Sequence, residues 1–181
     1  MQDEVQLHDK VFKKFITEAE IQSSIKSLVE RIERDYEGME LLLLPVLNGS
    51  FMFASDLMKE MSKNVSVSFV KVSSYQGNMQ TSGRVDELIG LNSSIVGKHV
   101  LIIEDIVDTG ITIDKVLTLL RAHYPAGVEV CTMLYKPEAY EGKNPPKYVG
   151  IEIPNRFVVG YGLDYNEYGR NLKEIYQLKE E

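Results

Sequence analysis

The stretch from Val100 to Thr112, VLIIEDIVDTGIT, constrains the fold of this chain more than any other part of it. It starts with the apolar, largely β-branched run Val100–Ile103, which is typical of a strand buried on both faces of a parallel sheet. Glu104 and Asp105 follow, and we expect them where this strand ends. In open α/β sheets ligands collect at the carboxyl ends of the strands, so these carboxylates are placed to bind sugar hydroxyls or a divalent cation.

The residues after the two acids predict an anion site at the start of a helix. Either Asp108 or Thr109 is expected to cap that helix, and Gly110 lets the backbone approach a ligand closely. Free amides at a helix start attract phosphate oxygens. A pair of acids after a strand is often no more than a solvated turn, but the full order of strand, acids, turn and helix is far more specific. The stretch therefore indicates a site for a sugar phosphate.

The rest of the chain alternates between strand and helix patterns. A helix is predicted over 18–36, where apolar residues recur at helical spacing after Thr17 as a cap. The other predicted helices cover 51–61 and about 113–123, and the predicted strands cover 41–47, 65–72, 87–91, 128–134, 148–153 and 157–161. Residues 73–86 read as a long loop, of the kind that serves as a lid or is merely exposed.

This alternation predicts an α/β fold with a mostly parallel sheet and helices on both of its faces. The length of 181 residues suits one domain with a full core, and no linker or repeat divides the chain. We therefore expect a single domain over 1–181.

The charge, the cysteine content and the hydropathy of the chain limit which partners it can bind and in which compartment it is expected. The net charge of -7 offers no electrostatic footprint for nucleic acid, although a local site can still hold a phosphate. Cys131 is the only cysteine and lies in an apolar run, which predicts a buried strand thiol and a reducing compartment. No apolar stretch approaches the ~20 residues that span a bilayer. We expect a cytoplasmic protein that binds neither nucleic acid nor membranes.

Four blocks of the sequence resemble the type I phosphoribosyltransferases. Residues 104–112, EDIVDTGIT, look like the family's motif for phosphoribosyl pyrophosphate (PRPP), and 46–51, VLNGSF, resemble its pyrophosphate loop. Residues 73–75 resemble the start of its flexible loop. Residues 157–170, FVVGYGLDYNEYGR, resemble the purine end of the 6-oxopurine branch. The blocks follow the family's order from about residue 41 to 178 and imply its fold, with a small hood made from the terminal segments.

For the sugar phosphate, the resemblance assigns roles to the acids and the turn. Glu104 and Asp105 would hold the ribose hydroxyls and help to organise Mg²⁺. Asp108 would be the general base that takes the proton from N7 of the purine. The amides and hydroxyls of the turn would hold the 5-phosphate, and its binding residues are Asp108, Thr109, Gly110, Ile111 and Thr112.

For the leaving group, the resemblance implies contacts from Asn48, Gly49, Arg170 and Mg²⁺, under a lid that opens with Ser74 and Tyr75. Many family members carry Lys or Arg where this chain has Asn48, so we expect weaker binding of pyrophosphate. Residues 137–140 also lack the arginines often found after the strand.

For the base, Lys136 would donate to O6 and Phe157 would stack on the ring. Main-chain groups at Val158 and Asp164 would read the 2-position, and the Asp164 carboxylate would reach a second Mg²⁺ through water. Taken alone, Lys136 would read as a solvated strand end and Phe157 as a core residue. A lysine can only donate, so it favours a 6-oxo group over the 6-amino group of adenine.

The expected activity is transfer of the phosphoribosyl group from PRPP to hypoxanthine or guanine, giving IMP or GMP and pyrophosphate in purine salvage. Two alternatives stay open: an enzyme that prefers xanthine, and a non-catalytic nucleotide sensor that keeps the fold. The family also implies a homo-oligomer, either a dimer or a tetramer.

Overall fold

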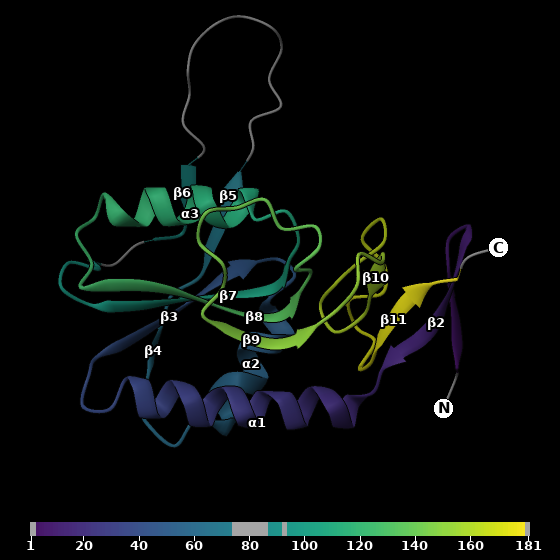
Figure 1. The fold of residues 1–181 in the computed structure, drawn as a ribbon, viewed down its shortest axis with the longest axis horizontal. Coiled ribbons are helices and arrows are strands. Elements are labelled where there is room, and N and C mark those ends of the chain that lie inside the picture. Colours follow the sequence, from purple (N-terminus) through teal and green to yellow (C-terminus); the bar gives the residue numbers. More distant parts are fainter. Residues whose placement is uncertain (1–2, 74–86, 92–93, 180–181) are drawn as a thin grey trace, which may run out of the picture.

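A twisted, mostly parallel sheet forms the body of the molecule (Figure 1). The computed structural model describes residues 3–73, 87–91 and 94–179, and within them this sheet has seven strands in the order β6-β5-β3-β7-β8-β9, with β4 beside β3. All neighbouring strands in it run parallel except β5 and β6. The strands are β3 (Leu41–Leu47), β4 (Ser66–Val67), β5 (Val70–Ser73), β6 (Glu87–Ile89), β7 (His99–Val107), β8 (Gly127–Tyr135) and β9 (Tyr148–Glu152).

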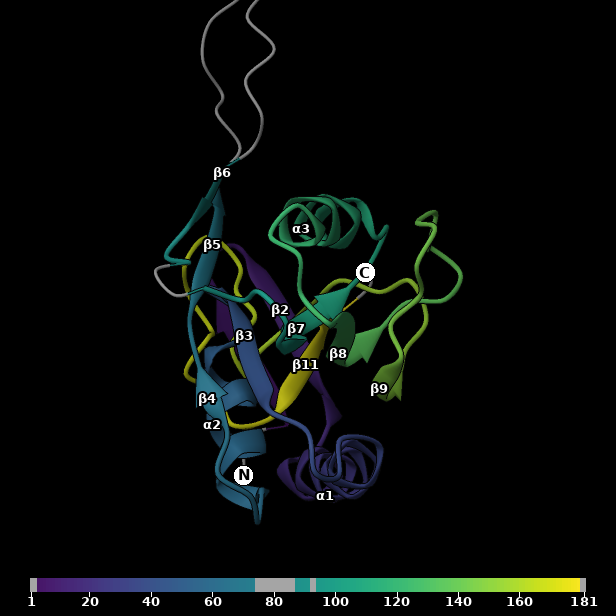
Figure 2. The same cartoon turned by 90° about the vertical axis from the view of Figure 1, so that its left-hand side faces the viewer.

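Helices cover both faces of this sheet, as the alternating pattern predicts (Figure 2). Helices α1 (Glu18–Asp35) and α2 (Phe51–Glu60) pack on one face, and α3 (Ile111–Arg121) packs on the other. Successive strand residues point to opposite faces, so Leu41 and Leu43 join the core under α1 while Leu42 and Leu44 join the core under α3. This two-sided burial explains why the central strands are uninterrupted apolar runs.

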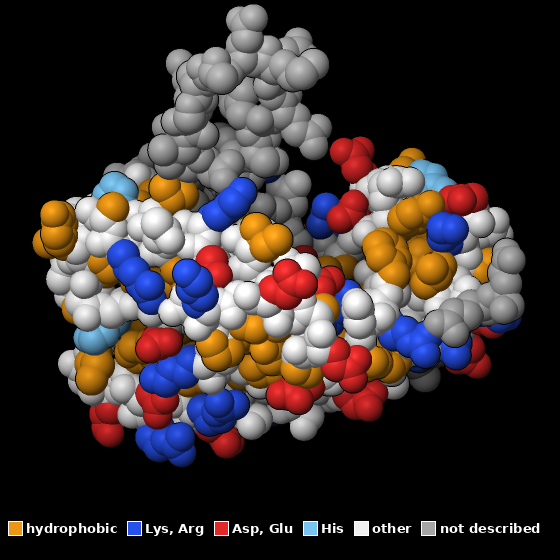
Figure 3. All heavy atoms as spheres, turned by 45° about the horizontal axis from the view of Figure 1, so that its top comes forward, with side chains coloured by type: hydrophobic (Ala, Val, Ile, Leu, Met, Phe, Trp, Pro, Cys, Tyr) orange, Lys and Arg blue, Asp and Glu red, His pale blue; other side chains and the backbone are white. Residues whose placement is uncertain are grey.

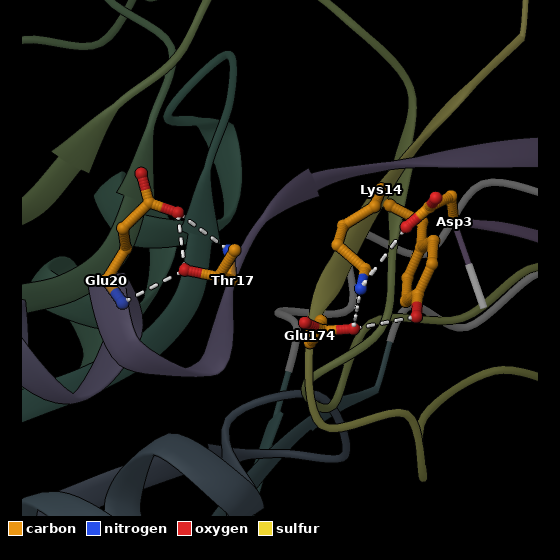
Figure 4. A network of polar contacts seen from close by, with 6 residues as sticks. Asp3, Lys14, Thr17, Glu20 and Glu174 are labelled. Atoms are coloured by element: carbon orange, nitrogen blue, oxygen red, sulfur yellow. Dashed lines mark hydrogen bonds and ion pairs between the residues drawn. The ribbon is translucent and has the colours of Figure 1, made fainter. Parts of the chain in front are cut away.

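Helix α1 begins where the sequence predicts, with Thr17 as its N-cap. The Glu20 amide donates to the Thr17 hydroxyl, and the Glu20 carboxylate accepts from both the amide and the hydroxyl of Thr17 (Figure 4). This reciprocal capping box satisfies amides that the first helical turn leaves free.

A second, antiparallel sheet forms a hood beside the body, in the order β1-β2-β11-β10. Phe12, Val159 and Tyr176 make its small core. Lys14 on β2 lies 2.9 Å from the Glu174 carboxylate and so ties the two ends of the chain together (Figure 4). The hood strands are β1 (Glu4–Leu7), β2 (Lys10–Ile16), β10 (Val158–Val159) and β11 (Ile175–Leu178).

The strands predicted over 65–72 and 157–161 differ from the structure. The strand predicted over 65–72 is interrupted at Ser68 and Phe69, because only the flanking residues on each side pair with β3. The strand predicted over 157–161 shrinks to Val158–Val159, because Gly160 and Tyr161 both turn into left-handed backbone. None of the helices in the described part of the chain is long and apolar enough to cross a membrane.

Candidate active site

The two acids of the opening motif lie within β7 rather than after its end. The strand continues to Val107 because its last two residues still pair with Leu134 and Tyr135 of β8. Glu104 is 6% exposed, and burial together with the nearby Asp105 carboxylate raises its pKa well above the usual value. Burial also raises the pKa of Asp105, while a hydrogen bond from the Ile106 amide opposes this. A buried carboxylate beside a half-buried one favours a ligand that brings positive charge or hydroxyl donors.

The turn from Asp108 to Thr112 opens α3 without a side-chain cap. The N-cap is Gly110, in left-handed backbone with φ 84°, and no side chain of the described residues caps the helix. The predicted capping by Asp108 or Thr109 is therefore wrong, and the helix starts two residues earlier than expected, at Ile111. Because no side chain occupies the amides at this end, they stay available to an anion.

Asp108 is instead paired with Lys136. The Lys136 Nζ lies 2.7 Å from Asp108 Oδ2, and the lysine side chain is 8% exposed while the aspartate is 45% exposed. The solvated strand-end alternative for Lys136 is therefore wrong. The pairing arises because β7 and β8 are neighbours, with the Lys136 amide donating to the Val107 carbonyl just beyond the ladder. The structure thus brings together two predicted site residues that are 28 positions apart.

The predicted pyrophosphate loop, 46–51, lies against Asp105 at Gly49. A Cβ on Gly49 would overlap the Asp105 carboxylate, so only glycine allows this approach. Asn48 is exposed, after a cis peptide bond with Leu47. Gly162, from the predicted purine end, sits on the other side, where a Cβ would overlap the Gly49 carbonyl. The segments predicted to bind the pyrophosphate and the purine therefore meet at Gly49.

Arg170 organises the segment after β10. Its guanidinium donates to the Gly162 carbonyl at 2.7 Å and pairs with the Asp164 carboxylate at 2.6 Å. The second Asp164 oxygen accepts from the Glu167 amide at 2.8 Å. Besides the larger effect of burial, the Arg170 guanidinium lowers the pKa of Asp105 and the Asp164 carboxylate raises it.

Phe157 comes directly before β10 and has 48% of its surface exposed. Its ring centroid is 5.9 Å from that of Tyr165, edge to face, and 6.1 Å from that of Phe12. The core-residue alternative is thus wrong for Phe157, whose exposed ring has room for a stacking partner. Val158, next in the chain, is buried in β10.

The predicted lid residues Ser74 and Tyr75 lie outside the described residues. A recess between the body and the hood carries charged side chains of both signs at its rim (Figure 3).

The acids of this site suit Mg²⁺ rather than a metal held by the protein alone. Carboxylate oxygens from Glu104, Asp105 and Asp164 are hard donors. The described residues contain no group of three or more acids, histidines or cysteines arranged to hold a metal. Mg²⁺ usually keeps several waters and binds through one or two carboxylates plus substrate phosphates, so a sparse acidic site fits it.

Comparison with known proteins identifies the arrangement. A family profile described as "Phosphoribosyl transferase domain" matches residues 16–166. The chain belongs to the phosphoribosyl transferase family. The resemblance inferred from the sequence and the predicted fold class are both confirmed, and so is the expectation of an enzyme of this family.

The relatives of this phosphoribosyl transferase match it nearly end to end. Hypoxanthine-guanine phosphoribosyltransferase of Staphylococcus aureus (strain Mu50 / ATCC 700699) is 42% identical over 97% of this chain and 98% of its own. The crystal structure of a hypoxanthine-guanine phosphoribosyltransferase from Bacillus anthracis, with HEPES in the active site, is 36% identical with a TM-score of 0.84, covering 94% and 99% of the two chains. The crystal structure of a hypoxanthine phosphoribosyltransferase from Staphylococcus aureus is 42% identical with a TM-score of 0.83, covering 92% and 91%.

Sequence reasoning missed two features of the site. Gly162 was not singled out, although its place among closely spaced glycines signals unusual backbone. Tyr140 received no role, yet its ring lies against Gly110 at the start of α3. No local pattern reveals this second contact, because the two residues come from different βα units.

Proposed function

We propose that this phosphoribosyl transferase makes IMP or GMP from PRPP and hypoxanthine or guanine, releasing pyrophosphate for purine salvage. The observation that carries the proposal is the contact between Lys136 and Asp108. A 6-oxopurine with a proton on N7 presents an acceptor, O6, beside a donor. A lysine beside a carboxylate offers the complementary donor and acceptor at the same spacing.

The base would slide between this pair and the exposed face of Phe157. Lys136 would shift from Asp108 to O6, and the freed carboxylate would accept the N7 proton as N9 attacks the anomeric carbon. An adenine would face Lys136 with a 6-amino donor, leaving two donors opposed. The relatives named for hypoxanthine and guanine support the same class of base.

The sugar phosphate would lie along the Asp108–Thr112 turn. The free amides of this turn suit the 5-phosphate, and Glu104 and Asp105 suit the ribose hydroxyls. Positive charge develops on the sugar as pyrophosphate departs, and the buried acids stabilise it. Arg170 and the exposed backbone near Gly49 face the leaving group.

Mg²⁺ is the proposed cofactor. Glu104 and Asp105 would help to organise one ion, and the Asp164 carboxylate would reach a second ion through water. Bound Mg²⁺ would neutralise the pyrophosphate charge. Ser74 and Tyr75 remain the proposed start of a lid that excludes water from the reacting sugar. We also propose a cytoplasmic homo-oligomer, a dimer or a tetramer, that binds neither nucleic acid nor membranes.

The proposal is tested by incubating the protein with Mg²⁺, PRPP and one base at a time. Hypoxanthine and guanine should yield nucleotide, and adenine should not. A preference for xanthine would instead support the alternative enzyme, and no product from any base would leave the non-catalytic sensor.

Substituting Asp108→Asn tests the general base. The amide keeps the shape of the side chain but cannot accept the proton, so kcat should fall by about 10²–10⁴-fold. Unchanged turnover in this variant would remove Asp108 from the proton transfer. Calorimetric binding of IMP checks that the variant still forms the site.

A further inference from the structure

The loop between β8 and β9, residues 136–147, lies over the start of α3. Its contacts with the turn and first helical turn come from three successive parts of the loop. The Tyr140 ring occupies the space beside Gly110, where a Cβ would overlap the ring carbons. The Glu141 amide donates to the Thr109 carbonyl at 3.0 Å. The amide of Lys143 and the side-chain amide of Asn144 both donate to the Asp114 carboxylate, at 3.2 Å and 3.1 Å.

The hydrogen bond from the Glu141 amide fixes the orientation of the whole Thr109–Gly110 peptide, not only that of the Thr109 carbonyl. In a trans peptide unit the C=O and the next N–H point in opposite directions. Holding the Thr109 carbonyl toward the loop therefore aims the Gly110 N–H away from the loop. Ile111, the next residue, is 58% exposed.

The Thr109–Gly110 peptide needs a restraint from outside the turn, because the turn itself does little to fix its orientation. Gly110 has φ 84°, and a glycine populates left-handed and right-handed backbone with similar ease, so the Thr109–Gly110 peptide can flip. No side chain of the described residues caps α3. A flipped peptide would put a carbonyl oxygen where a phosphate must bind.

The Tyr140 ring blocks that flip by filling the adjacent space. The Tyr140 ring packs against the Tyr135 ring, with ring centroids 5.5 Å apart and an interplanar angle of 70°. It also packs on the core under α3. The Tyr140 hydroxyl is buried and makes no hydrogen bond of good geometry within the described residues. The contribution of this side chain therefore comes from its ring.

We propose that Tyr140 and the Glu141 amide form a brace that holds the phosphate-binding peptide of the Asp108–Thr112 turn in its receptive orientation. Tyr140 is thus a positioning residue that sets affinity for the 5-phosphate of PRPP. The inference rests on the proposed function, because it assumes that this turn binds the sugar phosphate.

Two pairs of variants in the full-length chain test the brace. Tyr140→Ala removes the ring, while Tyr140→Phe keeps the ring and deletes only the hydroxyl. Glu141→Pro removes the N–H donor, while Glu141→Ala keeps it. Glu138→Ala, an exposed change in the same loop, is the matched control.

In steady-state assays, Tyr140→Ala and Glu141→Pro should each raise the KM for PRPP about tenfold, with the KM for hypoxanthine unchanged. Tyr140→Phe, Glu141→Ala and Glu138→Ala should keep the wild-type KM for PRPP. A rise in the KM for PRPP that is as large in Tyr140→Phe as in Tyr140→Ala would overturn the role of the ring. Equal increases of both KM values, with a lowered Tm, would show a general structural role and also overturn the proposal.

Calorimetry with ribose 5-phosphate separates this inference from the proposed function. The sugar phosphate should bind the wild type and Tyr140→Phe alike, and bind Tyr140→Ala about tenfold more weakly. If the wild type binds it but makes no nucleotide, the proposed function fails while the brace stands. If Tyr140→Ala binds as tightly as the wild type, the brace is wrong whatever the activity.

Discussion

Gly162 allows two segments of the candidate site to approach each other because it lacks a side chain. Its φ of 99° lies in the left-handed region, and its Cα faces the Gly49 carbonyl at a distance that leaves no room for a Cβ. Gly49 in turn faces Asp105. Two glycines from segments more than a hundred residues apart thus determine how closely the predicted purine and pyrophosphate segments approach each other.

Substituting Gly162→Ala should be far more costly than Gly38→Ala. Gly38 also has positive φ, 72°, but no described atom lies within 4 Å of where its Cβ would be. Gly38→Ala then bears only backbone strain of about 1 kcal/mol, whereas Gly162→Ala adds a backbone overlap and should cost about 3 kcal/mol or more.

Urea denaturation of both variants measures these costs. Equal losses of unfolding free energy in the two variants would show that backbone strain is the only cost at Gly162. The segments around Gly49 and Gly162 would then have room to move apart. The KM for PRPP should also rise in Gly162→Ala and stay unchanged in Gly38→Ala.

At the scale of elements, α1 is the part of the fold most completely specified by its own sequence. Its N-cap, its acidic first turn and the spacing of its buried face all lie within one stretch. Its buried residues are Ile21, Ile25, Leu28, Val29 and Ile32.

Thr17→Ala should destabilise the protein by about 1 kcal/mol, because it removes the acceptor of the Glu20 amide. For a chain of this size the Tm should fall by about 2–4 °C. Ser23→Ala, an exposed change within the same helix, serves as the control in differential scanning calorimetry. A Tm unchanged by Thr17→Ala would mean that tertiary packing alone fixes where α1 begins.

Elements with a strong local pattern could be predicted to within a residue or two. Strand β3 has the bounds expected from its apolar run, and α1 and α2 end one residue early. The N-terminal hairpin β1–β2 was not predicted, because its charged alternating pattern is weak and its pairing partner is β11, at the other end of the chain. The predicted start of α3 was wrong because Asp108, a residue type that often caps helices, pairs with Lys136 instead.

The candidate site shows the same division between local and distant information. Its blocks could be named from sequence, since each is a short motif. The ion pair of Lys136 with Asp108 and the contact of Tyr140 with Gly110 could not, because strand neighbours and loop paths decide them.

At the scale of the whole molecule, Asp56 on α2 joins the body to the segment after β10. Its carboxylate accepts from the Tyr161 hydroxyl at 2.8 Å and from the Gln22 side chain at 3.2 Å, and it pairs with Lys59 at 2.8 Å. Burial tends to raise the pKa of Asp56, but these hydrogen bonds outweigh it and hold the pKa below its usual value of 3.8.

Asp56→Asn should therefore destabilise the protein at neutral pH and lose this effect in acid. A lowered pKa in the folded state means that the charged group stabilises the fold above pH 3.8, and that this contribution vanishes as the pH falls through the folded-state pKa. The difference in Tm between wild type and Asp56→Asn should thus shrink from pH 7 to pH 3. A difference that stays constant over this range would contradict the assignment.

The hood has a consequence for the order in which the site is assembled on the ribosome. The proposed phosphate-binding turn and the loop that lies over it both precede β9 in the chain. The sheet that follows Phe157 is complete only when β11 pairs between β2 and β10. During synthesis, the turn proposed to bind the phosphate is therefore made before the segment that carries Phe157, the ring proposed to stack on the base.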